Sequence, residues 1–381
     1  FVESRAPGYR VRSGVRSPET AAELEELRRW TAELYQAGYL GADWPEEYGG
    51  SADHDPLREF VVGEEIARAR APMPAGGGAL AAHALIAFGT REQKDRYLPG
   101  IRSGEDVWCQ LFSEPDAGSD LASLRTSAVR EGEGWVVDGQ KVWTTDGHWA
   151  RYGYLLARTD PRAPRHRGIS AFVVDMRLPG VRVRPLRELT GTCDFNEVFL
   201  DRVRLPADAL IGSEGQGWRI ADASLARERS GVGASVVRLR LVWEELVELA
   251  RGLVFEGRPA LEAEDVRLRL AAFRAEVDAC AVMVHASMVR WRAGGERVID
   301  APAVKLTFSE LNLRMVEYAV SLLGGAGVLV EGDRDAVAGG RWQDAYLYAR
   351  AYTIAGGSSE IMRNIIAERA LGLPREPRPA R

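Results

Sequence analysis

The chain has 381 residues, of which 46% are hydrophobic and 28% charged, with a formal net charge of -5. These values are typical of a folded protein of two or three domains, and the acidic balance argues against nucleic-acid binding. No apolar run could cross a bilayer, the N-terminus lacks a signal pattern, and three widely spaced cysteines indicate free thiols, so we expect a cytoplasmic protein without a membrane span.

Residues 17–105 are predicted to be helical. Residues 21–36 are a run of strong helix formers that ends at Gly38, and residues 56–69 form a second run. The turn-rich segment 41–50 separates them. We therefore expect an N-terminal α-helical domain over residues 1–105.

Residues 106–212 have the pattern of a β domain. Asp138-Gly139 lies between β-prone flanks in VVDGQKVW and predicts a hairpin turn. The segments ISAFVVDM (169–176) and VRVRPL (181–186) predict further strands. We expect this middle domain to end near residue 212.

The remaining residues, 213–381, return to a helical pattern. Apolar residues recur at three- and four-residue spacing, which gives one apolar helix face. They are Val304, Phe308, Leu311, Met315, Tyr318 and Leu322. Helices followed by strands and then by helices predict an α+β protein. The five histidines show no metal-ligand spacing, so no metal site is expected.

Two segments of the β domain contain polar and aromatic residues that make them candidate functional segments. FSEPDAGSD (112–120) is a turn with several hydroxyls, and GQKVWTTDG (139–147) is a strand that ends in Trp-Thr-Thr. Considered alone, Trp143 is a core aromatic residue, and Ser113 and Ser119 are turn caps.

Four segments in the same order resemble the acyl-CoA dehydrogenase family. They are FSEPDAGSD, GQKVWTTDG, LLGGAGV (322–328) and AGGSSEIMRNIIAERALG (355–372). The resemblance covers nearly the whole chain. It implies an N-terminal helical domain, a middle β-barrel-like domain and a C-terminal four-helix bundle. It also implies an FAD-dependent oxidoreductase of fatty acid metabolism, which dehydrogenates an acyl thioester between Cα and Cβ.

The resemblance implies a set of FAD-binding residues. Trp143 would lie against the flavin ring, and glycines in LLGGAGV would let the backbone approach the ADP portion. The expected FAD-binding residues are Leu111, Ser113, Trp143, Thr144, Thr145, Gly324, Gly325, Ser358 and Glu360. Ser119 and Arg229 are expected to contact the substrate. The plain alternatives are helix caps for the glycines and for Ser358.

Dehydrogenation requires a carboxylate that takes the α-proton, while the flavin accepts the β-hydride. Many family members carry this glutamate just before the last helix, where this chain has Gly356. The branch typified by isovaleryl-CoA dehydrogenases carries it on an earlier helix, and GQGWRIADASLARERSG (215–231) resembles that helix. Glu228 is therefore expected to be the base, and the amide of Gly356 is expected to donate to the thioester carbonyl. Glu360 is the rival carboxylate.

The chain departs from the family at a second position. Residues 250–270 contain no clean Arg-x-x-Phe-Gly element, which in many members reaches the FAD of a neighbouring subunit. Arg251 and Arg258 are alternative substitutes. A homodimer, a homotetramer and a hetero-oligomer with an unseen partner all remain open. The family also implies an electron-transferring flavoprotein as the electron acceptor.

Three other functions remain open on the same scaffold. One is a flavin monooxygenase or oxidase, which does not need a glutamate base at this place. Another is a dehydrogenase that acts on a carrier-protein thioester instead of an acyl-CoA. The third is a subunit of a hetero-oligomeric dehydrogenase that has lost its own flavin.

Overall fold

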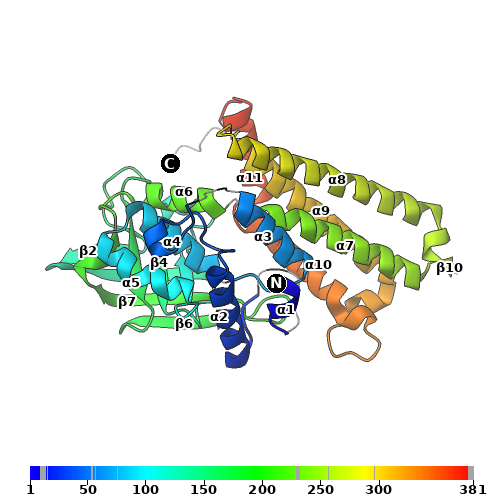
Figure 1. Ribbon diagram of the computed structural model, residues 1–381, viewed down its shortest axis with the longest axis horizontal. Coiled ribbons are helices and arrows are strands. Elements are labelled where there is room, and N and C mark those ends of the chain that lie inside the picture. The colour runs from blue at the N-terminus through cyan, green and yellow to red at the C-terminus, as the bar shows by residue number, and fades with distance from the viewer. Residues whose placement is uncertain are drawn as a thin grey trace.

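The structure is a computed structural model that describes residues 1–8, 14, 16–52, 55, 57–74, 76–228, 232–255, 257–295 and 297–375. Its description of residues 76, 226–228, 232 and 233 is limited to the helical backbone. A β-sheet with short helices against it forms one end of the molecule, and long helices form the other end (Figure 1).

Helices α1 to α5 precede the sheet. They are α1 (Val2–Arg5), α2 (Ala21–Gln36), α3 (Leu57–Arg68), α4 (Gly76–Phe88) and α5 (Arg91–Arg102). The two helices expected from the sequence are confirmed as α2 and α3. Thr20 caps α2 by accepting a hydrogen bond from the backbone N–H of Glu23, so the helix starts where its first turn finds an acceptor.

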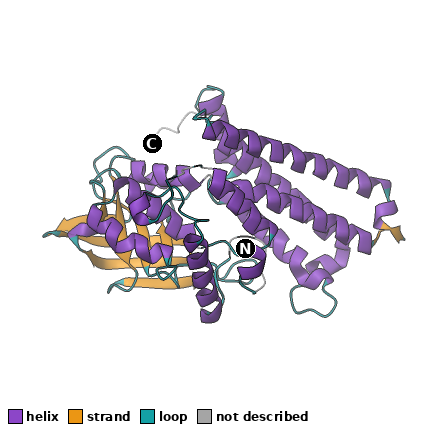
Figure 2. Ribbon diagram, in the orientation of Figure 1, coloured by secondary structure: helices purple, strands orange, loops and turns teal. Residues whose placement is uncertain are grey.

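The strands form one sheet in the order β6-β7-β3-β2-β4-β5-β8, with β1 pairing in parallel with β4. They are β1 (Trp108–Leu111), β2 (Ser127–Glu131), β3 (Gly134–Thr145), β4 (Tyr152–Arg158), β5 (Ile169–Asp175), β6 (Val181–Leu186), β7 (Phe195–Leu205) and β8 (Leu210–Ile211). Strands β4 and β5 are buried along almost their whole length, because helices cover one face of the sheet (Figure 2) and the other face lines a separate core.

The predicted hairpin at Asp138-Gly139 is wrong. Strand β3 runs through both residues, and its register with β7 shifts between Val137 and Gly139, which marks a bulge. A Cβ at position 139 would lie 2.7 Å from the Cα of Thr126. The glycine is therefore needed for a close approach of two backbones, and the β2–β3 turn lies at Gly132 instead.

The C-terminal part is dominated by a bundle of long helices. The helices are α6 (Gly217–Glu228), α7 (Val232–Gly252), α8 (Glu264–Arg292), α9 (Asp300–Leu323), α10 (Arg341–Ile354) and α11 (Ser359–Ile365). Helices α7 to α10 pack around one core, and a short ribbon of β9 (Val254–Phe255) and β10 (Arg258–Pro259) joins α7 to α8. The predicted apolar face of α9 is confirmed, with Tyr318 only partly buried.

Helix α6 lies outside the bundle, against α4 and β5. Its buried face shares a core with α4, α5 and the near face of the sheet, whereas a separate core lies inside the sheet. The predicted α+β order of helices, sheet and bundle is confirmed. Within the described ranges, none of the helices has both the length and the apolar content that a membrane crossing requires.

Candidate active site

A buried ion pair fixes the loop after β1 to strand β3. Glu114 accepts a hydrogen bond from Nζ of Lys141 at 2.8 Å and two more from the backbone N–H groups of Arg125 and Thr126. Lys141 is 0% exposed, and burial lowers its pKa to about 8. Burial alone would raise the pKa of Glu114, but Lys141 and the hydrogen bonds from Arg125 and Thr126 together outweigh burial and lower the pKa. The loop is therefore held in one position before any ligand arrives.

The expected loop residues differ in their accessibility. Ser113 is half-buried, and its carbonyl accepts a hydrogen bond from the backbone of Val142 at 2.9 Å, which places it beside β3. Ser119 is exposed. Leu111 is fully buried in the core inside the sheet, so its side chain does not face a ligand. Its neighbour Gln110 is half-buried, and sequence reasoning missed this polar residue; strand alternation is the signal that points to it.

The end of β3 carries Trp143, Thr144 and Thr145. Trp143 has a φ of 60° and is 61% exposed, although it is a large aromatic residue in a strand. A bulge between Lys141 and Thr144 allows this conformation. Thr144 is fully buried, and its hydroxyl has no hydrogen-bond partner among the described residues. A strained, exposed aromatic next to an unpaired hydroxyl is typical of a binding site.

The turn before α11 carries the second group of expected residues. Gly356 has a φ of 66° and is exposed, and the carbonyl of Gly357 accepts a hydrogen bond from Lys305 at 2.5 Å. Ser358 caps α11 by accepting from the backbone of Ile361. The first turn of this helix lowers the pKa of Glu360, which is exposed. A carboxylate with a lowered pKa is a weak base, which argues against the rival residue.

Gly324 and Gly325 follow the last turn of α9 and lie on the surface. An added Cβ at either position would meet nothing within 4 Å. The fold therefore does not require glycine at 325, whereas Gly324 has a φ of 54°.

Glu228 is the last residue of α6, and its side chain is not described; Arg229 lies outside the described residues. The helix is fixed by its buried residues Ile220 and Ser224, and the hydroxyls of Ser224 and Tyr154 lie 3.4 Å apart. Position 228 is four residues after Ser224 and so continues the same face of the helix.

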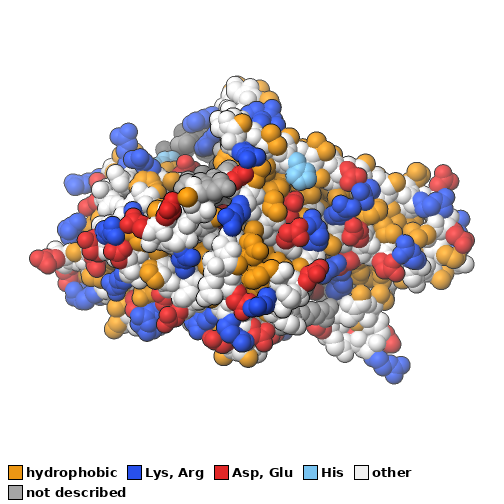
Figure 3. Space-filling model, in the orientation of Figure 1, with side chains coloured by type: hydrophobic (Ala, Val, Ile, Leu, Met, Phe, Trp, Pro, Cys, Tyr) orange, Lys and Arg blue, Asp and Glu red, His pale blue; other side chains and the backbone are white. Residues whose placement is uncertain are grey.

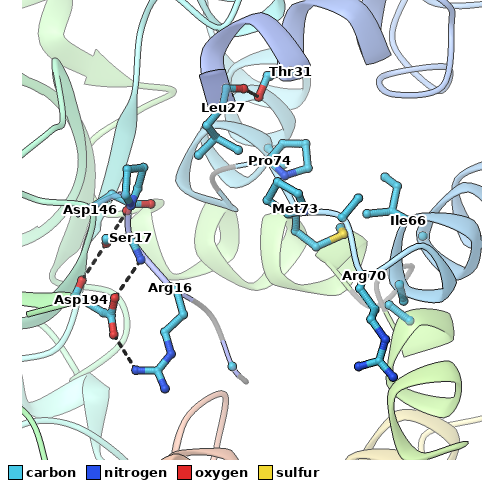
Figure 4. A pocket seen from close by; sticks show the side chains of 18 of the residues that line it. Arg16, Ser17, Leu27, Thr31, Ile66, Arg70, Met73, Pro74, Asp146 and Asp194 are labelled. Atoms are coloured by element: carbon cyan, nitrogen blue, oxygen red, sulfur yellow. Dashed lines mark hydrogen bonds and ion pairs between the residues drawn. The ribbon is translucent and has the colours of Figure 1, made fainter. Parts of the chain in front are cut away.

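A cavity of about 890 Å³ lies where the helices before the sheet, the sheet and the bundle meet. Apolar side chains such as Leu27, Ile66 and Met73 line one side, and Asp146 and Ser17 line the other (Figure 4). The hydroxyl of Ser17 donates to Asp146 at 2.5 Å, and burial raises the pKa of Asp146 to about 6. Asp146 directly follows Thr145, so the cavity begins at the end of β3. No group of three metal-ligating side chains occurs in the part of the chain that is described.

Comparisons with known proteins cover almost all of the chain. It matches the descriptions "Acyl-CoA dehydrogenase, N-terminal domain" over residues 13–105, "middle domain" over residues 109–203 and "C-terminal domain" over residues 215–371. It is 42% identical to "Acyl-CoA dehydrogenase IpdE1" of Mycobacterium tuberculosis, over 93% of this chain and 89% of that one.

Two solved structures are similar throughout. "Tcur3481-Tcur3483 steroid ACAD" has a TM-score of 0.84 at 33% identity, over 92% of this chain and 90% of that one. The "ChsE4-ChsE5 complex from Mycobacterium tuberculosis" has a TM-score of 0.82 at 32% identity, over 94% of both chains. The chain belongs to the acyl-CoA dehydrogenase family, and its activity is the FAD-dependent dehydrogenation of an acyl-CoA.

Proposed function

We propose that FAD binds at the end of β3, with its ring against Trp143. Three observations support this: the exposed Trp143, the unpaired hydroxyl of Thr144 and the loop that holds Ser113 in place. Thr145, at the end of β3, and Gln110, in β1, are half-buried and would complete the polar contacts. When bound, the flavin supplies the acceptor for the β-hydride. The glycines at 324 and 325 would approach the ADP portion, and Ser358 and Glu360 would lie beside the cofactor.

We propose that Glu228 takes the α-proton of the thioester. Its position in the chain, four residues after the buried Ser224 of α6, supports this role. A carboxyl in a pocket without water has a pKa raised toward neutral pH, which makes it a stronger base. The backbone N–H of Gly356 would donate to the thioester carbonyl oxygen, where negative charge develops as the proton leaves. Ser119 is exposed and would contact the pantetheine or phosphate part of the substrate. Arg229, which follows the base in sequence, would also contact the substrate.

We propose a bulky, ring-bearing acyl group as the substrate. The observation that carries this proposal is the cavity of about 890 Å³, which adjoins the end of β3 and has mainly apolar side chains along the helices. Such a volume is at the upper end of small-molecule sites. The similar structure that is named a steroid ACAD supports the same class of substrate.

The experiment is an anaerobic mixture of the purified protein with short, straight, branched and ring-bearing acyl-CoAs, followed by the visible absorption of the flavin. We expect ring-bearing thioesters to bleach the flavin band most rapidly. Faster bleaching by a straight short chain would overturn the proposed substrate class. A stable band with every acyl-CoA would favour a carrier-protein thioester or the oxidase alternative.

The base is tested separately by Glu228→Gln. An amide cannot accept the α-proton, so we expect flavin reduction by the best substrate to slow about 10²–10⁴-fold while the bound flavin stays the same. Glu360→Gln tests the rival carboxylate, which is exposed and has a lowered pKa, so we expect it to keep flavin reduction. If Glu360→Gln loses reduction and Glu228→Gln keeps it, the base is Glu360.

We propose that the chain works in an assembly with a second chain of the same fold. Helix α8 has an apolar stripe on its exposed side in addition to its buried face, and hydrophobic side chains show along that part of the bundle in Figure 3. The stripe consists of Leu268, Ala272, Ala275, Ala279, Val282 and Val289. An apolar stripe along a 29-residue helix fits a partner helix. The similarity to a two-protein complex supports a hetero-oligomer. As the family resemblance implies, an electron-transferring flavoprotein would reoxidise the reduced flavin.

Val282→Glu tests this assembly. Val282 is 68% exposed, so the folded chain accepts a charge there, whereas an apolar interface does not. We expect sedimentation to show a smaller particle for the variant than for the native chain. The same mass for both proteins would remove α8 from the interface.

A further inference from the structure

The guanidinium group of Arg16 bridges the sheet and the bundle. One of its terminal nitrogens donates to Asp194 at 3.0 Å and to the hydroxyl of Thr192 at 3.0 Å. The other terminal nitrogen donates to both carboxylate oxygens of Asp344, each at 2.9 Å. Figure 4 shows Arg16 reaching Asp194 at the edge of the cavity. Thus one side chain from the N-terminal segment contacts two other parts of the fold.

This bridge is largely shielded from water. The side chains of Arg16, Asp194 and Asp344 are 11%, 3% and 19% exposed. The guanidinium also lies over the ring of Tyr348, with 4.4 Å between its carbon and the ring centroid. Burial alone would lower the pKa of Arg16, but Asp344 and Asp194 outweigh it and raise the pKa. A planar fork can contact both carboxylates at once, which the single ammonium group of a lysine cannot reproduce.

On the sheet side, the bridge leads to the end of β3. Asp194 directly precedes β7, whose residues Phe195 and Asn196 pair with Thr145 and Thr144. The side-chain amide of Asn196 also donates to the carbonyl of Thr144 at 2.9 Å. Any displacement of Asp194 therefore displaces the strand end that carries Trp143.

The N-terminal segment adds two hydrogen bonds at the same place. The backbone N–H of Ser17 donates to Asp194 at 2.8 Å, and its hydroxyl donates to Asp146. Arg16 therefore does not contact Asp194 as an isolated side chain, because the backbone next to it is bonded to the same carboxylate.

On the bundle side, the bridge leads to the turn that carries Gly356. Asp344 lies in the first turn of α10, and this helix ends at Ile354, two residues before Gly356. Trp342, Ala345 and Ala349 anchor the helix in the bundle core. A packed helix moves as a rigid element, so the position of its first turn sets the position of the turn after its end.

We propose that Arg16 is a positioning residue that fixes the distance between the end of β3 and the Gly356 turn. These are the two sides that the proposed function assigns to the flavin ring and to the thioester carbonyl, and the proposal rests on that function. Arg16 itself touches neither reacting group. Its loss leaves both walls folded but lets them move relative to each other, and catalysis depends on their separation.

Hydrogen exchange tests the bridge without any ligand. In Arg16→Gln we expect about tenfold faster exchange both in peptides with residues 143–146 and in peptides with residues 343–348. Arg290→Gln is the matched control, because Arg290 makes a similar two-point pair with Asp300 between α8 and α9. A change in only one of the two segments, or the same change in the control, would overturn the bridge.

The rate of flavin reduction per bound flavin tests the positioning role. We expect a loss of about tenfold or more in Arg16→Gln and in Arg16→Lys, and an unchanged rate in Arg290→Gln. Asp344→Asn removes one arm without removing Arg16, so it should reproduce the loss if Arg16→Gln folds poorly. An unchanged rate per flavin in folded Arg16 variants would reduce the bridge to a structural contact. If the native protein holds no flavin, the proposed function fails. The hydrogen-exchange experiment still shows whether Arg16 couples the end of β3 to α10.

Discussion

The two halves of the proposed cofactor site differ in how they are built. In the sheet, a fully buried lysine and a glutamate fix the loop against β3, and Thr144 is enclosed although its hydroxyl is unpaired. In the bundle, Gly325 and Gly356 are exposed, and an added Cβ at either position would touch nothing. The sheet half is complete within the chain. In the bundle half, the backbone at these two glycines is open to a ligand.

The difference has a physical cause. Residues of the sheet half are joined by strand pairing and by a desolvated ion pair, so their positions follow from contacts within one chain. The glycine turns lie at helix ends, where backbone groups have no partners within the helix and await a ligand or a second chain. Substitutions in the sheet half should therefore change stability, and those in the bundle half should change binding.

The largest effect on stability is expected from Lys141→Met. The change leaves Glu114 buried without its cation, which costs roughly 3–5 kcal/mol of unfolding free energy. Urea denaturation followed by tryptophan fluorescence measures this loss. The double variant Lys141→Met with Glu114→Gln removes both charges and should regain at least half of it. A double variant as unstable as the single one would contradict the role of the charge pair.

Asp146→Asn should raise the free energy of unfolding at neutral pH, by a smaller amount than Lys141→Met lowers it. The folded pKa of Asp146 is raised from 3.8 to about 6, so the folded state binds the proton more tightly than the unfolded chain does. The ionised carboxyl then costs up to about 3 kcal/mol above pH 6, and this cost disappears as the pH falls toward 4.

The pH dependence separates this effect from simple packing. We expect Asp146→Asn to be more stable than the native protein at pH 7 and equally stable near pH 4, as measured by thermal unfolding at both pH values. A stability difference that is the same at pH 7 and pH 4 would show that Asp146 is ionised without cost in the folded protein.

The smallest effect on stability is expected from Gly325→Ala. Neither a clash nor a positive φ opposes the methyl group, so the free energy of unfolding should change by no more than about 0.5 kcal/mol. FAD should nevertheless dissociate about tenfold more readily, because the backbone could no longer approach the cofactor. Gly252→Ala, at the end of α7 and equally open, is the control that should change neither property. Unchanged FAD affinity in Gly325→Ala would remove this glycine from the site.

Periodicity and helix propensity were sufficient for several elements of the fold. They predicted α2, α3, β5, β6 and the apolar face of α9, because these elements are set by local side-chain pattern. They failed at Asp138-Gly139, where a glycine that usually marks a turn serves a close contact with Thr126. That contact joins segments that are adjacent only in the folded sheet.

The sequence by itself determined the family, the order of the three parts and the segments that form the proposed site. It could not determine which residues of those segments are accessible: Leu111 is buried in the core and Gln110 is not, because strand alternation depends on the register with β4. Lys141 is one of three lysines in an arginine-rich chain, and only the structure shows that it pairs with Glu114. Arg16 gave no signal at all, because its partners are 178 and 328 residues away in sequence. Contacts of that range are decided by tertiary packing, which brings distant charges together where water is excluded.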